Sequence, residues 1–205
     1  MEFSLPQPAS PRALRDLPMW TRGLRTVQWH ASDPNGDALR YSVHVHRVDE
    51  GAWIKVGEDL ESTSFTWDTG ALPDGRYRLR VTASDAAGNP LGEERTTEAF
   101  SQPLTVDNTP PQVTSFAARG EKGAVALEGK AEDGLSPLSR IEVAIDDEDW
   151  RTVTPEGGFA DDRTLSFRAR LPKIEPGDHT VSVRAVDLAG NAATRASRVT
   201  VPAGR

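Results

Sequence analysis

The 205-residue sequence contains no cysteine and few aromatic residues. Without cysteine the chain has no disulfide framework, and both thiol chemistry and cysteine–zinc sites are excluded. With 6% aromatic residues, a core has to be built largely from Val and Leu, with a few Trp and Phe. No apolar run approaches the roughly 20 residues that span a bilayer. Residues 1–6 also lack the basic and apolar regions of a secretory signal, so an extracytoplasmic location would require a signal elsewhere in a longer protein.

The chain also lacks an excess of positive charge. It carries 24 basic and 31 acidic side chains, a net charge of −7. Domains that bind nucleic acid gather Lys and Arg against the phosphate backbone, so this balance argues against a nucleic-acid partner. Amphipathic stretches with a 3.6-residue period are missing as well, which excludes a helical core.

Short stretches of alternating apolar and polar residues are what the sequence does contain. This period-two alternation is typical of half-buried β-strands, and turn-forming Gly, Pro, Asn and Asp residues separate the stretches. Strands at such short spacing predict an all-β sandwich, with a barrel as the alternative. In the first half the expected strands cover residues 27–33, 41–46, 53–56, 65–67, 76–83 and 99–106.

The second half of the chain repeats the first. Asp33 matches Asp133 at an offset of 100 residues, and Asp85 matches Asp187 at an offset of 102. The Ala-Gly-Asn sequence that follows the second aspartate is identical in both halves. Because the small changes of offset fall in turns, we expect a tandem duplication, which gives two Ig-like or fibronectin type III-like β-sandwiches.

The two copies join at Asp107–Pro111, within the sequence Val-Asp-Asn-Thr-Pro-Pro. Before the first copy, four prolines remove backbone donors, so the N-terminal segment is expected to be an edge strand or extended chain anchored by Leu14, Leu17 and Trp20. The predicted organisation is a Pro-rich segment packed on or leading into the first domain (1–22), a first sandwich (23–106), a linker (107–111) and a second sandwich (112–205).

Several of these residues resemble a fibronectin type III domain. The resemblance rests on Val27-x-Trp29, Tyr41-x-Val43 and the run from Leu72-Pro73 to Tyr77-x-Leu79-x-Val81-x-Ala83. It implies that Tyr77 is the corner tyrosine, whose hydroxyl binds neighbouring backbone. The second copy has His179 at that position and Gly129 in place of the tryptophan, and it is similar to a bacterial Ig-like repeat.

The Asp-x-Ala-Gly-Asn ends and the joint are similar to those between tandem Ig-like repeats of bacterial extracellular proteins, including pairs that follow β-propellers at the C-terminal end of large proteins. The resemblance covers roughly residues 23–201. It implies a secreted, periplasmic or cell-surface location, with neighbouring domains of a larger polypeptide, another protein or a glycan as partners. It implies fold more strongly than function, because sandwich modules serve many roles.

The loop at residues 33–37 is a first candidate calcium site. Asp33, Asn35 and Asp37 place oxygen ligands at alternate positions, but the glycine spacing does not fit an EF-hand. In a sandwich Asp85 and Asn89 should lie at the same end and join them. The alternative is a metal-free turn, since Asn-Gly is a strong turn signal and Asp before Pro caps its own backbone. The sequence favours the turn.

A second candidate calcium site lies at the joint. Asp107, Asp133 and Asp187 are expected to converge there, because the loops that carry the last two should face the start of the second copy. The alternative is a proline-stiffened linker without metal, in which Asp107 caps a turn. The sequence again favours the turn, so no cofactor is expected and calcium remains the alternative.

A basic stripe on the first domain is a candidate binding surface. His44 and His46 lie two residues apart on one expected strand, a spacing of imidazoles that suggests zinc. The positive charge of the arginines expected on the neighbouring strand disfavours a metal there. An anionic glycan or acidic partner is one alternative, and Arg side chains that only cover the sheet and pair with Glu or Asp are the other. The stripe comprises Arg40, His44, His46, Arg76, Arg78 and Arg80.

The chain contains neither a Gly-x-Ser-x-Gly nucleophile motif nor a phosphate-binding glycine loop, so we expect no enzymatic activity. The acidic run 146–149 is expected to be a solvated hairpin tip that protects a sheet edge. The sequence therefore predicts a non-catalytic spacer or presentation module. The alternative is a carbohydrate- or protein-binding module that uses the basic stripe or Trp20, with calcium stiffening the pair.

Overall fold

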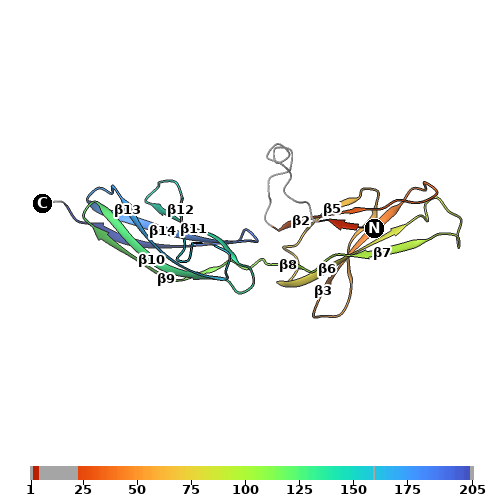
Figure 1. Cartoon of the computed structure of the whole chain (residues 1–205), viewed down its shortest axis with the longest axis horizontal. Coiled ribbons are helices and arrows are strands. Elements are labelled where there is room, and N and C mark those ends of the chain that lie inside the picture. Colours follow the sequence, from red (N-terminus) through yellow and green to blue (C-terminus); the bar gives the residue numbers. More distant parts are fainter. Residues whose placement is uncertain (1, 5–22, 159, 204–205) are drawn as a thin grey trace. The chain divides into compact units, whose positions relative to one another are not determined.

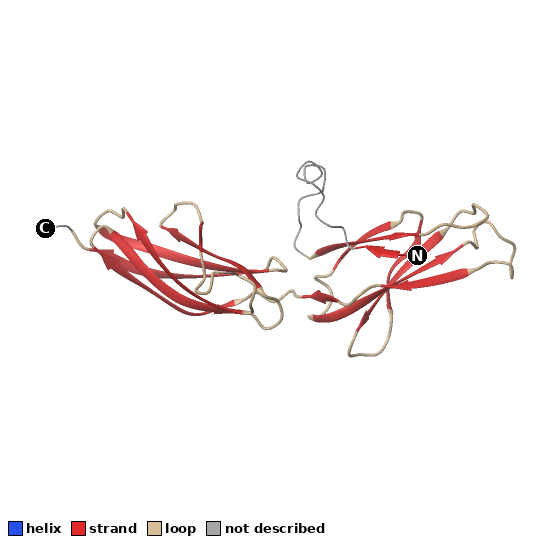
Figure 2. Cartoon of the chain, viewed as in Figure 1, coloured by secondary structure: helices blue, strands red, loops and turns tan. Residues whose placement is uncertain are grey.

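The structure is a computed structural model that describes residues 2–4, 23–158 and 160–203, and these residues form only strands and loops (Figures 1 and 2). Within this part of the chain, no helix is long and apolar enough to cross a membrane. Most of the proline-rich segment, including Leu14, Leu17 and Trp20, lies outside the described residues.

The chain divides into two compact units, the first ending at Val106 and the second beginning at Asp107. Each unit consists of two antiparallel sheets packed around its own apolar core. The predictions of an all-β fold and of two tandem sandwiches are thus confirmed.

In the first unit, one sheet has the order β1-β2-β5 and the other the order β4-β3-β6-β7, with β8 also paired to β6. The core forms because alternate residues of each strand turn inward. Trp29 of one sheet meets Tyr41 of the other edge-on, with ring centroids 5.2 Å apart. The strands are β1 (Glu2–Ser4), β2 (Leu24–His30), β3 (Arg40–Arg47), β4 (Ile54–Leu60), β5 (Ser64–Asp68), β6 (Gly75–Ser84), β7 (Thr96–Phe100) and β8 (Leu104–Val106).

The second unit has one sheet in the order β13-β10-β9 and another in the order β12-β11-β14-β15. Among the described residues, its core is aliphatic around one buried phenylalanine, Phe167. The strands are β9 (Gln112–Glu121), β10 (Ala124–Glu132), β11 (Leu138–Ile145), β12 (Arg151–Val153), β13 (Thr164–Pro172), β14 (Gly177–Asp187) and β15 (Ala192–Val201).

The duplication is visible in the strand register. In the first unit Val43 of β3 lies opposite Val81 of β6, and in the second Val143 of β11 lies opposite Val183 of β14. The tryptophan missing from the second copy also has a structural explanation. A Cβ atom added to Gly129 would lie only 2.5 Å from Cζ of Phe167, so the phenylalanine ring occupies the space beside this position.

The last predicted strand of the first domain, 99–106, is two strands instead of one. β7 begins earlier, at Thr96, and β8 begins at Leu104. Between them the Ser101 hydroxyl accepts the Leu79 amide at 3.0 Å, and Pro103 has no amide to donate to a ladder. At the break between the two strands, the Ser101 side chain thus accepts a hydrogen bond that a backbone carbonyl would accept in a continuous strand.

The corner residues of the two units have equivalent contacts. The Tyr77 hydroxyl donates to the Pro73 carbonyl at 2.8 Å, as the fibronectin resemblance implies. In the second unit His179 Nε2 lies 2.9 Å from the Glu175 carbonyl, also four residues earlier. His179 therefore makes the corner contact in the second unit that Tyr77 makes in the first.

The acidic run 146–149 is more than a solvated tip. Asp146 has a positive φ of 50° and accepts the Thr180 amide at 2.8 Å. Its other oxygen lies 2.8 Å from His179 Nδ1. The hairpin between β11 and β12 is therefore fixed to β14 by this side chain.

Candidate metal centre

Three aspartates of the second unit converge at one end of its sandwich. Asp107 lies just before β9, Asp133 directly follows β10, and Asp187 ends β14. One carboxylate oxygen from each lies within 4.8 Å of the others. Asp107 is only 6% exposed and Asp187 only 2%, whereas Asp133 is half-buried. The structure therefore brings together the predicted residues of the joint, all within the second unit.

Local turns hold two of the three carboxylates. Asp133 Oδ1 accepts the amides of Leu135 and Ser136, both at 2.7 Å, and Asp107 Oδ1 accepts the Thr109 amide at 3.1 Å. The turn cap expected of Asp107 thus uses one oxygen of its side chain, and Asp133 caps its own turn with one oxygen as well. The second oxygen, Oδ2, of both Asp107 and Asp133 is buried and has no hydrogen-bond partner among the described residues.

Asn191 organises the third carboxylate. Its backbone amide donates to Asp187 Oδ1 at 2.8 Å and its side-chain Nδ2 donates to Asp187 Oδ2 at 2.7 Å. The same Nδ2 donates to the Asp107 backbone carbonyl at 3.0 Å. We did not predict Asn191 as a site residue, although the Ala-Gly-Asn sequence shared by both copies was the available signal.

The carboxylates affect one another electrostatically. Burial raises the pKa of Asp107, and the charges of Asp133 and Asp187 raise it further. The Ser136 hydroxyl and the Thr109 amide lower it in part. Three carboxyl groups, two of them buried, therefore share one site, an arrangement that is costly unless it is compensated.

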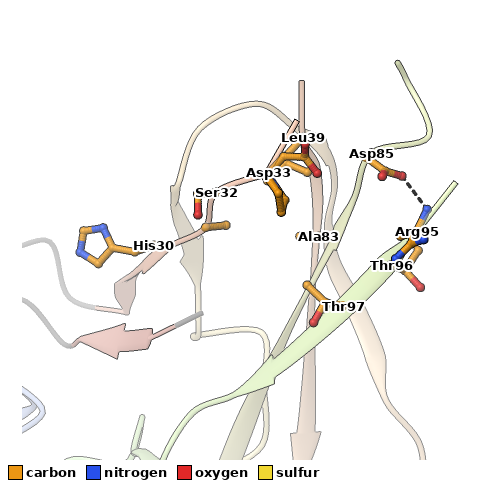
Figure 3. Close-up of a pocket in the computed structure, with 11 residues that line it drawn as sticks. His30, Ser32, Asp33, Leu39, Ala83, Asp85, Arg95, Thr96 and Thr97 are labelled. Atoms are coloured by element: carbon orange, nitrogen blue, oxygen red, sulfur yellow. Dashed lines mark hydrogen bonds between the residues drawn. The ribbon is translucent and has the colours of Figure 1, made fainter. Parts of the chain in front are cut away.

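The first unit has a related group at the matching loops. Carboxylate oxygens of Asp33, Asp37 and Asp85 also lie within 4.8 Å of one another. Asp33 and Asp85 line an open pocket, where the Asp85 side chain accepts the Arg95 amide at 2.6 Å (Figure 3). Asp33 and Asp37 belong to the predicted loop, and Asp85 directly follows β6. The predicted aspartates are thus neighbours.

The hydrogen bonds of this first-unit group are those of a closed turn. Asp33 Oδ1 accepts the amides of Asn35 and Asp37, at 2.7 and 3.2 Å. Asn35 contributes its backbone and is exposed. Asn89 Nδ2 donates to Asp37 Oδ2 at 3.4 Å and to the Asp85 carbonyl at 3.0 Å. None of these aspartates has a carboxylate oxygen that is both buried and unpaired in the part of the chain that the structure describes.

The predicted basic stripe lies on paired strands of the first unit. His44 of β3 is opposite Arg80 of β6, and His46 is opposite Arg78. Arg76 and Arg78 are exposed, and no carboxylate among the described residues lies within 4.0 Å of their guanidinium groups. These two arginines are the accessible charges of the stripe.

Two other arginines of the stripe are paired with acids. Arg40 forms ion pairs with Glu61 and, at 3.6 Å, with Asp59. Arg80 pairs with Glu98 of β7 at 3.4 Å. These ion pairs neutralise part of the positive charge of the stripe. Arg40 and Arg80 thus agree with the alternative prediction, in which arginines cover the sheet and pair with nearby acids.

An aromatic side chain covers the middle of this face. The Trp53 ring lies 5.0 Å from His46 and 5.8 Å from Phe100, measured between ring centroids, and the Arg80 guanidinium lies 4.8 Å from its centre. Burial, together with the Arg80 charge, lowers the pKa of His44. The face is therefore less basic than the sequence suggests and more aromatic.

The two self-contained sandwiches define a tandem Ig-like protein. A profile of the family described as Bacterial Ig-like domain (group 3) matches residues 61–202, more than half of the chain. The chain belongs to this family. Ig-like domains of this kind are typically non-catalytic structural or interaction modules and are commonly extracellular.

Comparisons with individual proteins give more distant similarities. The chain is 28% identical over 127 residues to the uncharacterized protein YvnB of Bacillus subtilis (strain 168), which covers 61% of this chain and 8% of that protein. Among solved structures, the FN1–FN3 domains of chicken CNTN1 match with 13% identity and a TM-score of 0.44, over 89% of this chain and 64% of that one. The fibronectin(III)-like modules of Clostridium thermocellum CbhA match with 14% identity and a TM-score of 0.44, over 89% and 87%.

Proposed function

We propose that the chain is a non-catalytic spacer or presentation module within a larger extracytoplasmic bacterial protein. The observation that carries this proposal is the anchored joint. Asn191 holds the carbonyl of Asp107, the Asp107 side chain caps the Thr109 amide, and Pro110-Pro111 follow before β9 begins.

Such a joint limits the backbone freedom of the connecting residues. Proline fixes φ near −65°, and two prolines in sequence form a short stiff spacer. The hydrogen bonds of Asp107 fix the residue at which the chain enters the second unit. A passive flexible tether would need none of these contacts, whereas a spacer that presents other domains at a set distance needs them.

Spin labels placed in the two units test the stiffness of the joint. The absence of native cysteine allows labels to be attached only at introduced cysteines, here at the exposed positions Gln28 and Ala117. A narrow distance distribution is expected, and replacing Pro110 and Pro111 by Gly should broaden it. Pro90→Gly, in a loop of the first unit, is the matched control and should leave the distribution unchanged. A parent distribution already as broad as that of the diglycine variant would contradict the spacer role.

A second candidate function is binding of an anionic glycan or acidic protein by the face of the first unit. The aromatic cover favours it, because Phe100 is 50% exposed and lies beside Trp53 on the face that also carries the two accessible arginines. Exposed apolar groups next to charge are common features of binding surfaces.

Glycan and protein arrays test this second function with the parent and with the Arg76→Ser/Arg78→Ser double variant. Salt-sensitive binding that the double variant loses would support it. Arg119→Ser removes an exposed charge of the second unit and serves as the control. Arrays without a ligand, or binding that is indifferent to the double variant, would rule this face out.

A further inference from the structure

We propose that Asp107, Asp133 and Asp187 form the binding site for one calcium ion in the second unit. The site goes beyond the spacer role and stands without it, because it rests on the carboxylates themselves and not on what the joint does.

The geometry of the three oxygens suits one ion of calcium size. Calcium–oxygen distances are about 2.3–2.6 Å, so ligands on opposite sides of the ion lie roughly 4.8 Å apart. The three oxygens lie within 4.8 Å of one another, and they therefore fit on one coordination sphere. An all-oxygen ligand set suits calcium, magnesium or manganese and not zinc, which prefers nitrogen and sulfur in tetrahedral sites.

Two buried oxygens without partners are the second, independent observation. Oδ2 of Asp107 and Oδ2 of Asp133 have no hydrogen-bond partner among the described residues, although both side chains use Oδ1 in a turn. A buried unpaired carboxylate oxygen is costly, and a cation between two of them removes that cost. A turn cap alone explains the two Oδ1 atoms and leaves both Oδ2 atoms unexplained.

Neighbouring groups can complete the coordination. Each oxygen of Asp187 accepts one bond from Asn191 and retains a second lone pair for an ion. Ser136 is 5% exposed and its hydroxyl lowers the pKa of Asp107, so this hydroxyl is near enough to offer a further oxygen. Calcium takes 6–8 oxygens, and water supplies the rest. Asn191 is a positioning residue, because it orients Asp187 and fixes the Asp107 backbone.

The same chain provides an internal reference. In the first unit the related aspartates, Asp33, Asp37 and Asp85, show no buried unpaired oxygen among the described residues, and Asn89 already donates to Asp37. Proximity of acids is equal in the two units, whereas unpaired buried oxygens occur only in the second. We therefore assign the ion to the second unit alone.

Nitrogen–proton NMR spectra of the full chain test this assignment without any mutation. After chelation, added calcium should shift the amides of residues 107–109, 133–136 and 187–191, and leave those of residues 33–37 and 85–89 in place. Shifts confined to the first-unit loops would overturn the assignment, and an absence of shifts at millimolar calcium would overturn the site.

Titration calorimetry and thermal unfolding of the full chain add stoichiometry and energy. One calcium ion should bind per chain, and at 100 times the dissociation constant the folding equilibrium of the second unit should rise about 100-fold. Asp133→Asn should abolish binding, and the matched Asp33→Asn should retain it. Loss of binding in Asp33→Asn but not in Asp133→Asn contradicts the proposal. Equal binding of magnesium would overturn the choice of calcium, and superimposable melts with calcium and with chelator would overturn the site itself.

This test is separate from that of the spacer role. A stiff joint without calcium binding leaves the spacer proposal standing and removes the metal. Calcium binding together with a broad spin-label distance distribution leaves the metal site standing and removes the spacer proposal. A variant that fails to fold is recognised by its amide dispersion, and the spectra of the parent then decide alone.

Discussion

At the scale of single residues, the corner of each unit depends on one polar side chain. Tyr77 is 3% exposed and donates to the Pro73 carbonyl, and burial raises its pKa. In the second unit His179 has two partners, the Glu175 carbonyl and the Asp146 carboxylate. Both partners only accept hydrogen bonds, so both imidazole nitrogens must carry protons for both bonds to form.

Tyr77→Phe should destabilise the first unit by about 1 kcal/mol, because one buried hydrogen bond is lost and the Pro73 carbonyl is left without its donor. Denaturant unfolding followed by tryptophan fluorescence measures the change in midpoint. An unchanged midpoint would show that the corner bond contributes nothing to stability.

His179 makes the stability of the second unit depend on pH. The Asp146 contact, followed by the Glu175 carbonyl, raises the pKa of His179, and the His179 contact lowers the pKa of Asp146. The histidine contribution is fully present below its unfolded pKa of about 6.5 and is lost as pH rises through the folded value. The aspartate contribution is present above about 3.9 and is lost as pH falls through the folded value.

The pair should therefore stabilise the second unit most between roughly pH 4 and 6.5. Melting temperatures of the parent and of His179→Gln, measured from pH 3 to 9, should differ most in that window and converge on both sides. His179→Tyr provides the control, since it keeps a corner donor to Glu175 and removes the titrating group. A difference between parent and His179→Gln that does not vary with pH would contradict the role of the imidazolium.

At the scale of strands, β9 and β15 of the second unit approach each other closely at Gly120. A Cβ atom at Gly120 would lie 1.9 Å from the Thr200 carbonyl oxygen and 2.7 Å from its carbonyl carbon. These are backbone atoms, which cannot rotate away as a flexible side chain could. The glycine is therefore required by the crossing of the two strands.

Gly120→Ala should destabilise the second unit by about 1–3 kcal/mol, the usual cost of overpacking, and more if the strands cannot separate. Gly134→Ala is the matched control, because an added Cβ there meets no atom within 4 Å. Both should be measured by denaturant unfolding in chelator, so that calcium does not enter the comparison. Equal stability of the two variants would contradict the steric argument.

The strands themselves follow closely from the alternation in the sequence. The inward residues of β3 and β6 were predictable because a period of two allows only one face to be apolar. The break between β7 and β8 was not, because the contact of Ser101 with Leu79 joins residues far apart in the sequence.

The candidate site was predictable in part for the same reason. The repeat indicates that Asp133 and Asp187 occupy equivalent loops. Which carboxylate oxygen a turn uses depends on the side-chain rotamer, so the unpaired oxygens could not be foreseen. The pairing of Arg40 with Glu61 likewise depends on how β4 approaches β3, which alternation does not specify.

At the scale of the whole chain, each unit has its own core, as expected of domains that fold independently. Residues 107–205 expressed alone should unfold in one cooperative transition. The residue at which such a fragment begins affects its structure, because Asp107 belongs to the second unit by its contacts.

A fragment of residues 107–205 should retain the calcium response, whereas one of residues 112–205 should lose most of it, because it lacks one of three carboxylates. Calorimetric titration of the two fragments, with the first unit (residues 1–106) as the control, measures the difference. Equal responses of the two fragments would show that Asp107 is not a ligand.

The position of Asp107 has a mechanical consequence. The chain reaches the second unit at this residue, before the first hydrogen bonds of β9. Tension from the N-terminal side therefore acts on Asp107 first. With calcium bound, that load is shared by the ion, Asp133 and Asp187, which follow different strands, before β9 can be peeled from β10. Calcium would then set the force that this unit withstands, a property distinct from its melting temperature and one that matters for a module joined to others in a long chain.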